Sequence, residues 1–162
     1  MKRRRLLLGP LVLAVAILLG ACGGDGGHAG HGGDEAGTSV ALGEQADAGE
    51  ADRTIEVTAS DKLEFDPDSL DVDAGEVITF KVTNEGKAEH EFVLGDEAYQ
   101  EEHEKAMAGG EHHSNEDANA VALPPGETAE LTWHFTESGE IQFACHVGGH
   151  YEGGMFGVIT VQ

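Results

Sequence analysis

Polar and apolar side chains alternate in short runs from residue 53 to the end of the chain. Alternation with a period of two indicates β-strands that bury one face. Turn-forming pairs such as Ala74-Gly75 and Ser138-Gly139 separate the runs. The pattern predicts strands at residues 54–59, 63–65, 70–72, 76–82, 90–94, 127–135, 141–145 and 155–161. Short strands of this kind, with turns about every 8–12 residues, predict one all-β sandwich domain over residues 53–162.

One segment, at about residues 96–120, interrupts the strand pattern. Its first part is rich in helix-forming residues and ends at Gly109-Gly110, so we predict a short helical insertion there. His103 and Met107 are four residues apart and would share one face of this helix. Because histidine and methionine are residues that bind copper, the candidates for a secondary metal site are His103, Met107, His112 and His113. The alternative is a solvated acidic helix and loop whose histidines are incidental.

Residues 1–21 have the pattern of a secretory signal peptide: a basic start, a short apolar run and small residues at the end. The apolar run is shorter than the roughly 20 residues that a membrane-spanning helix needs. Leu19-Gly20-Ala21-Cys22 resembles a bacterial lipobox, which would make Cys22 the lipidated first residue of the mature protein. The alternatives are an ordinary cleavable signal and a twin-arginine signal. We therefore expect an exported protein with a lipid anchor on the cell membrane, facing the periplasm or the cell surface.

Residues 22–52 are rich in glycine, lack aromatic residues and show no apolar periodicity. Such a segment cannot bury enough surface to order itself, so we predict a disordered, flexible linker. His28 and His31 within it are candidates for weak metal capture, or simply part of a polar spacer.

The chain carries 9 basic and 31 acidic residues, with a formal net charge of −22. Four of the basic residues lie in the predicted signal peptide, so the mature chain would be more acidic still. This charge argues against binding to nucleic acid or to anionic lipid, and leaves the lipid anchor as the expected membrane contact. It fits a basic protein partner, or solubility at high salt.

The stretch from Cys145 to Met155 places a thiol, an imidazole and a thioether at Cys-x4-His-x4-Met spacing, between two predicted strands. Soft sulfur ligands together with imidazole select copper, and a site of two histidines and one cysteine with a weak axial methionine is the blue-copper pattern. With Cys22 lipidated, Cys145 has no disulfide partner in an oxidising compartment, so metal ligation best explains it. This loop lacks the second imidazole, and His90, which opens a predicted strand well upstream, is a candidate for it.

Here the sequence resembles the cupredoxin family of plastocyanin- and azurin-like blue copper proteins. The motifs that carry the resemblance span about residues 53–162 and are Phe65-Asp66-Pro67, Ala74-Gly75-Glu76, Asn84-Glu85-Gly86, His90-Glu91-Phe92, Pro125-Gly126 and the loop from Cys145 to Met155. The resemblance implies a Greek-key β-sandwich with one type 1 copper per chain. It implies His90, Cys145 and His150 as strong ligands and Met155 as the axial ligand. The alternatives are His146 as ligand in place of His150, and structural roles for His90 and Met155.

The resemblance also implies a function: a monomeric one-electron carrier whose partner is a redox protein, such as a basic cytochrome. The insertion resembles the His- and Met-bearing insertion of cupredoxins associated with bacterial copper tolerance. This favours an alternative function, copper binding for tolerance or sequestration.

Three features depart from the common pattern. Val147-Gly148-Gly149 lacks the proline of many cupredoxins, so a glycine N–H could donate to the thiolate. Glu91 stands where many cupredoxins have an asparagine that ties the two ligand segments together. His146, next to Cys145, matches multicopper oxidases, but Ala144 and the lack of His-x-His pairs argue against a trinuclear cluster. We expect no enzymatic activity, and a solvent-exposed His146.

Overall fold

The computed structural model describes residues 42–109 and 117–162. The predicted signal peptide, Cys22, His28, His31, His112 and His113 lie outside the described residues. Within the described ranges, no helix has the length and apolar character needed to cross a membrane.

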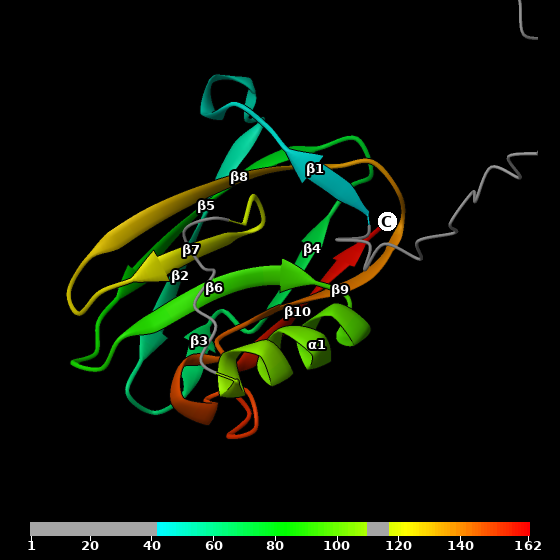
Figure 1. Cartoon of the computed structure of the whole chain (residues 1–162). Helices are drawn as coiled ribbons and strands as arrows, with labels where there is room; N and C mark the ends of the chain where they lie inside the picture. Colours follow the sequence, from blue (N-terminus) through cyan, green and yellow to red (C-terminus); the bar gives the residue numbers. More distant parts are fainter. Residues whose placement is uncertain (1–41, 110–116) are drawn as a thin grey trace, which may run out of the picture. The chain divides into compact units, whose positions relative to one another are not determined.

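Two five-stranded sheets form the domain, which confirms the predicted β-sandwich (Figure 1). The first sheet has the order β1 (Gly43–Gln45), β8 (Thr128–Phe135), β5 (Val77–Asn84), β2 (Arg53–Ser60) and β3 (Glu64–Asp66). The second has the order β4 (Ser69–Val72), β10 (Phe156–Val161), β9 (Gly139–Ala144), β6 (His90–Gly95) and β7 (Ala120–Leu123). The pairs β2–β5 and β4–β10 are parallel, and the other neighbours are antiparallel.

Two of these strands lie where the sequence pattern predicted none. β1 falls within the predicted linker, yet it pairs with β8, so the domain begins before residue 53. Gly43 in β1 has no room for a side chain because it lies against the Trp133 ring and the His134 carbonyl. β7 falls within the insertion and pairs with β6. β1 carries no apolar side chain and β7 carries no polar one, so neither shows the alternation that indicates a strand.

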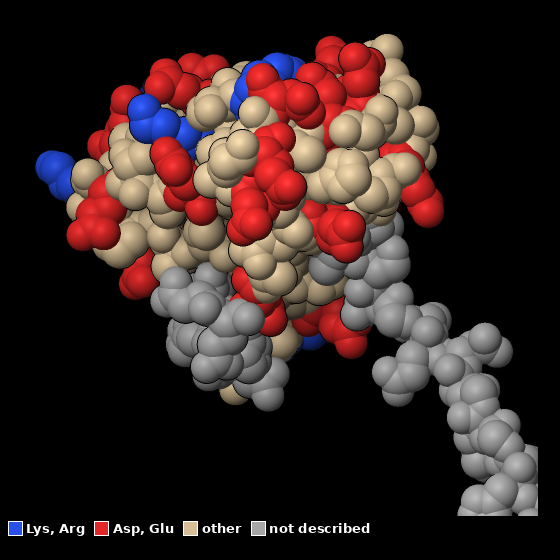
Figure 2. All heavy atoms as spheres, turned by 90° about the horizontal axis from the view of Figure 1, so that it is seen from above, with Lys and Arg blue, Asp and Glu red and all other residues tan. Residues whose placement is uncertain are grey.

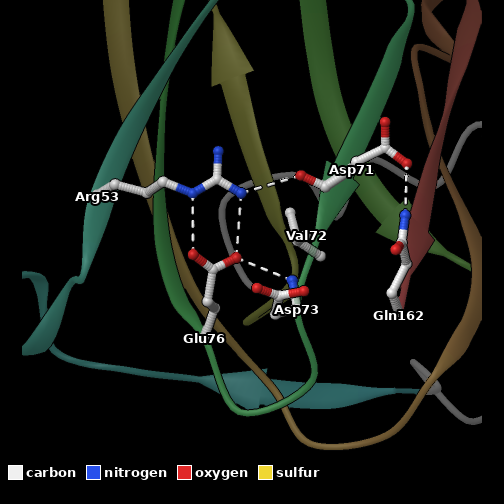
Figure 3. A pocket seen from close by; sticks show the side chains of 6 residues that line it. All are labelled: Arg53, Asp71, Val72, Asp73, Glu76 and Gln162. Carbon is white, nitrogen blue, oxygen red and sulfur yellow. Dashed lines mark hydrogen bonds and ion pairs between the residues drawn. The ribbon is translucent and has the colours of Figure 1, made fainter.

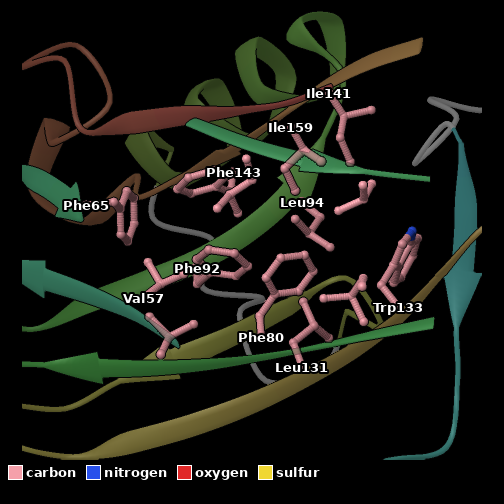
Figure 4. Packing of buried hydrophobic residues seen from close by; sticks show 14 of the residues in the cluster. Val57, Phe65, Phe80, Phe92, Leu94, Leu131, Trp133, Ile141, Phe143 and Ile159 are labelled. Carbon is pink, nitrogen blue, oxygen red and sulfur yellow. The ribbon is translucent and has the colours of Figure 1, made fainter. Parts of the chain in front are cut away.

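Aromatic side chains fill the space between the sheets next to the loop from Cys145 to Met155, called here the metal loop (Figure 4). The Phe92 ring lies 5.1 Å from Phe143, 5.4 Å from Phe80 and 5.8 Å from Phe65, measured between ring centroids. Side chains two residues apart on a strand share a face. His90 on β6 and Cys145 just after β9 therefore continue the inward-facing rows of Phe92 and Phe143.

The predicted helix is present as α1 (Glu97–Ala108) and contacts β6, β9 and the metal loop. Its N-cap is Asp96, whose side chain accepts a hydrogen bond from the Tyr99 N–H at 2.8 Å. Gln100 reaches from the helix to the sheet, where its Nε2 donates to the carbonyls of Val93 at 2.9 Å and Gln142 at 3.3 Å. The insertion is thus fixed to the strands that carry the site.

The end of β10 away from Met155 carries a polar cluster (Figure 3). Arg53 makes hydrogen bonds of 3.0 Å to both carboxylate oxygens of Glu76 and one of 2.9 Å to the Asp71 carbonyl. The Gln162 side chain donates to Asp71 at 3.1 Å. Exposed pairs of this kind contribute little stability each, but they link β2, β4 and the chain end.

Candidate metal centre

The structure brings together the three residues expected as strong ligands. His90 is the first residue of β6, Cys145 directly follows β9, and His150 directly follows the short 3₁₀ helix η2 (Val147–Gly149). The Cys145 Sγ lies 3.7 Å from His90 Nδ1 and 3.3 Å from His150 Nδ1. Among the described histidine, cysteine and carboxylate side chains, these three form the one group arranged to hold a metal ion.

Met155 lies at the other end of the same loop and is fully buried in the core cluster that includes Cys145. The Cys145 N–H donates to the Met155 carbonyl at 3.1 Å, and the Met155 N–H donates to the His150 carbonyl at 3.0 Å. These bonds fix both ends of the loop against each other. Its role as axial ligand stays a prediction.

Glycines allow the loop to return His150 to Cys145. Gly148 and Gly149 have φ angles of 59° and 81°, in the left-handed region that other residues rarely adopt. The Gly149 N–H donates to the His146 carbonyl at 3.4 Å rather than to the thiol. The backbone donors at the sulfur are instead Glu91, whose N–H lies 3.4 Å from Sγ, and Val147. The expected donation from a glycine N–H to the thiol is therefore replaced by donation from the backbones of Glu91 and Val147.

Burial affects the protonation of two of the expected ligands, Cys145 and His90. Burial raises the pKa of Cys145 to about 12, although the Glu91 and Val147 backbone bonds oppose it. Burial and the neighbouring His150 lower the pKa of His90. A neutral imidazole is ready to bind, whereas the thiol is inert until a metal displaces its proton. Two imidazoles and one thiolate, with a thioether on the same loop, are the donor set that copper prefers.

His146 is buried, so the prediction of a solvent-exposed residue is wrong. Its ring points to α1, where Nδ1 lies 2.8 Å from Glu104 Oε2 and Nε2 lies 2.8 Å from Gln100 Oε1. Burial lowers the pKa of His146, and the hydrogen bond with Glu104 raises it. The burial of this side chain depends on α1, which lies far upstream: Glu104 and His146 are 42 positions apart in the sequence.

Glu91 connects the strand that begins at His90 with the loop that begins at Cys145. Its Oε1 accepts a hydrogen bond from the His146 N–H at 2.9 Å, and its own N–H faces the Cys145 sulfur. The sequence did not reveal a contact that holds the segment before His90: Asp61, in the turn after β2, accepts bonds of 2.8 Å and 3.0 Å from the N–H groups of Lys87 and Ala88. An aspartate in a turn gives no local signal of such a contact.

Two of the four residues expected to form a secondary metal site, His103 and Met107, lie in the described part of the chain. His103 is buried against Glu91, with Nε2 3.7 Å from Oε1, and its ring stacks on Tyr99. Met107 is half-buried and lines a hollow with Glu104 and His146. His112 and His113 lie outside the described residues, so a secondary site that includes them stays a prediction.

Comparison with known proteins identifies the family. The sequence model for copper-binding proteins of the plastocyanin/azurin family matches residues 51–162. The chain is a cupredoxin. The predicted cofactor, copper, is that of the family, and His90, Cys145 and His150 form the candidate centre for it.

This cupredoxin is 38% identical to the copper-resistant cuproprotein CopI of Rubrivivax gelatinosus, over the whole of both chains. The protein of the same name from Pseudomonas aeruginosa is 38% identical over 75% of this chain and 83% of its own. The structure of reduced auracyanin from Roseiflexus castenholzii has a TM-score of 0.61 and 27% identity, and the match covers 69% of this cupredoxin and 98% of that chain. Copper-resistance proteins and auracyanins are thus both among its relatives.

The apparent copper affinity of the metal-free cupredoxin is expected to rise about tenfold per pH unit between about pH 7 and 9. Cys145 must release its proton to bind copper, and its pKa of about 12 lies above this range. His90, whose pKa is lowered, is already neutral there and releases none. Competition titrations against a chelator of known pH dependence measure the slope. A flat profile would contradict a thiolate ligand, and a Cys145→Ser protein should lose the slope.

Proposed function

We propose that this cupredoxin exchanges single electrons at one type 1 copper outside the cytoplasm, in the service of copper tolerance. The convergence of His90, Cys145 and His150 on one buried point carries the proposal. The tolerance role is supported by the copper-resistant cuproproteins that it resembles, one of them along the entire chain. Signal-like residues 1–21 support export, and acylation of Cys22, which mass spectrometry of the mature N-terminus would test, supplies the membrane anchor.

When bound, copper supplies the Cu(II)/Cu(I) couple. The residues around it hold the donors in place: two are fixed at strand ends, and the glycine turn and the Cys145–Met155 backbone bond fix the loop. Donors that do not move suit both oxidation states and keep the rearrangement on electron transfer small. His90 is fully buried, whereas His150 is half-buried. The His150 ring is therefore the ligand through which electrons would enter and leave.

The surface of the protein favours a basic redox partner. Asp and Glu side chains are spread over the face in Figure 2, where Lys and Arg are few. The net charge of −22 gives the whole molecule a strong negative field, which steers cations towards it. A basic cytochrome is a partner of this kind.

Electron exchange between the copper-loaded protein and a basic cytochrome c is the experiment that tests this function. We expect the second-order rate measured by stopped flow to fall at least about tenfold between low and physiological salt, because screening removes the attraction. An acidic cytochrome of similar potential is the control and should react slowly at every salt concentration.

Copper titration separates this function from the second candidate, sequestration. Saturation at one copper per chain, with fast exchange, supports the one-electron function. Several coppers per chain without electron exchange would contradict it and favour sequestration, with the insertion as the additional binding segment.

A further inference from the structure

Asp61 is an exposed residue in the turn between β2 and β3, and its carboxylate holds the segment that leads into His90. Its Oδ1 accepts hydrogen bonds from the N–H groups of Lys87, at 2.8 Å, and of Ala88, at 3.0 Å. These two residues come just before His90, the first residue of β6. One side chain thus fixes the entry to a strand that begins with an expected copper ligand.

Gly86 provides the room for this contact. A Cβ atom at position 86 would overlap the Asp61 Oδ1 and lie 2.9 Å from its Cγ. The φ of Gly86 is not in the left-handed region, so the backbone conformation by itself does not require glycine. The close approach of Asp61 does require it.

The His90 ring needs a defined orientation at the copper site, and its Nδ1 lies 3.7 Å from the Cys145 sulfur. A neutral imidazole that binds a metal through Nδ1 carries its proton on Nε2. This Nε2 is buried and has no hydrogen-bond partner among residues 42–109 and 117–162. Asp61 Oδ1 lies 3.9 Å from it, which is longer than a hydrogen bond. The orientation of the ring therefore depends on the backbone that carries it.

We propose that Asp61 is a positioning residue for copper binding, which holds the segment before His90 so that Nδ1 stays directed at Cys145. A donor that is oriented before the metal arrives binds it more tightly, because less conformational freedom is lost on binding. The property that matters is an acceptor oxygen at the place of Oδ1, rather than a charge. The inference rests on the copper site of the proposed function and adds a residue that prepares it.

Two substitutions of Asp61 test the role of this oxygen. Asp61→Ala removes the acceptor, whereas Asp61→Asn keeps an amide oxygen in its place. We expect Asp61→Ala to bind Cu(II) about tenfold more weakly, and Asp61→Asn to stay within about twofold of the unmodified protein. Competition titrations of the metal-free proteins against a chelator measure these affinities. Equal affinities of the two variants would overturn the proposal.

Asp52→Ala is the matched control for stability. Asp52 lies directly before β2, whereas Asp61 directly follows it, and the Asp52 carboxylate accepts the Val77 N–H at 2.9 Å. Both alanine variants lose an exposed carboxylate that binds backbone N–H groups, so both should lower the unfolding free energy of the metal-free protein. Only Asp61→Ala should also weaken copper binding and change the electron paramagnetic resonance spectrum of the Cu(II) protein. The same loss of affinity in Asp52→Ala would overturn the proposal.

Gly86→Ala tests the contact from its other side. The added methyl group displaces the Asp61 side chain, so we expect a loss of copper affinity close to that of Asp61→Ala. In the protein that already carries Asp61→Ala, the methyl group has no carboxylate to displace and should cost less than about twofold. Equal losses with and without the Asp61 side chain would overturn the proposal. If Asp61→Ala does not fold, an unchanged affinity in Gly86→Ala alone would do so.

The unmodified protein separates this inference from the proposed function. If it binds copper without exchanging electrons, the proposed function fails. If it binds copper and exchanges electrons, and Asp61→Ala has an unchanged copper affinity, only the role of Asp61 fails.

Discussion

Replacing Cys145 by serine is expected to abolish the intense visible absorption of the copper-loaded protein and to weaken copper binding by more than about 100-fold. Loss of a residue that merely supports a metal ligand already weakens binding by about 10–100-fold, and here the thiolate itself is removed. The intense colour arises from the covalent bond between sulfur and Cu(II), which an alcohol does not form. Visible and electron paramagnetic resonance spectra after addition of one equivalent of Cu(II) measure both effects.

The serine variant should keep its fold. Serine is close to cysteine in size, so the buried site loses about 1–3 kcal/mol of unfolding free energy through the unsatisfied hydroxyl. Tyr151→Phe is the loop control: it removes a 3.0 Å hydrogen bond to Gln142 without touching a copper ligand, and its spectrum should stay intense. An unchanged spectrum in Cys145→Ser would refute the assignment of the sulfur as a ligand.

Phe92→Ala is expected to lower the unfolding free energy by about 3–5 kcal/mol. The Phe92 ring is fully buried between the sheets and contacts three other phenylalanines, Phe65, Phe80 and Phe143. Truncation leaves a cavity that these rings can fill only in part. Since whole domains are stable by about 5–15 kcal/mol, this is a large fraction of the total. Urea unfolding of the metal-free protein, followed by circular dichroism, gives the change.

Phe156→Ala provides the comparison, because Phe156 is 41% exposed and follows the metal loop directly. Its loss should be about 1 kcal/mol or less. Equal losses for the two variants would show that the aromatic cluster is not the main source of stability. Phe92 also stands two residues after His90, so we expect its removal to loosen the copper site as well as the core.

The local pattern of the sequence was sufficient for most of the fold. Alternation identified the longer strands, and helix-forming residues followed by Gly109-Gly110 identified α1. The strands β1 and β7 were missed because their sequences, Gly-Glu-Gln and Ala-Val-Ala-Leu, do not alternate between polar and apolar residues. Their pairing is decided by the neighbouring strands β8 and β6, which lie far away along the chain.

For the candidate site, the spacing of residues along the chain was sufficient to predict the donors. Cys145, His150 and Met155 lie on one loop between β9 and β10. Because these two strands pair with each other, the residues of the loop stay close together. His90 was identified by its place at the start of a strand, and the structure brings it to Cys145.

The surroundings of these donors, in contrast, depend on contacts between distant parts of the chain. The bond from His146 to Glu91 joins residues separated by 55 positions, and the one from His146 to Glu104 joins residues separated by 42. No local pattern encodes such contacts: the first depends on the pairing of β6 with β9, and the second on the packing of α1 against these strands. The sequence therefore indicated the donors of a copper site, whereas strand pairing placed the Glu91 carboxylate beside His146 and the packing of α1 buried the His146 ring.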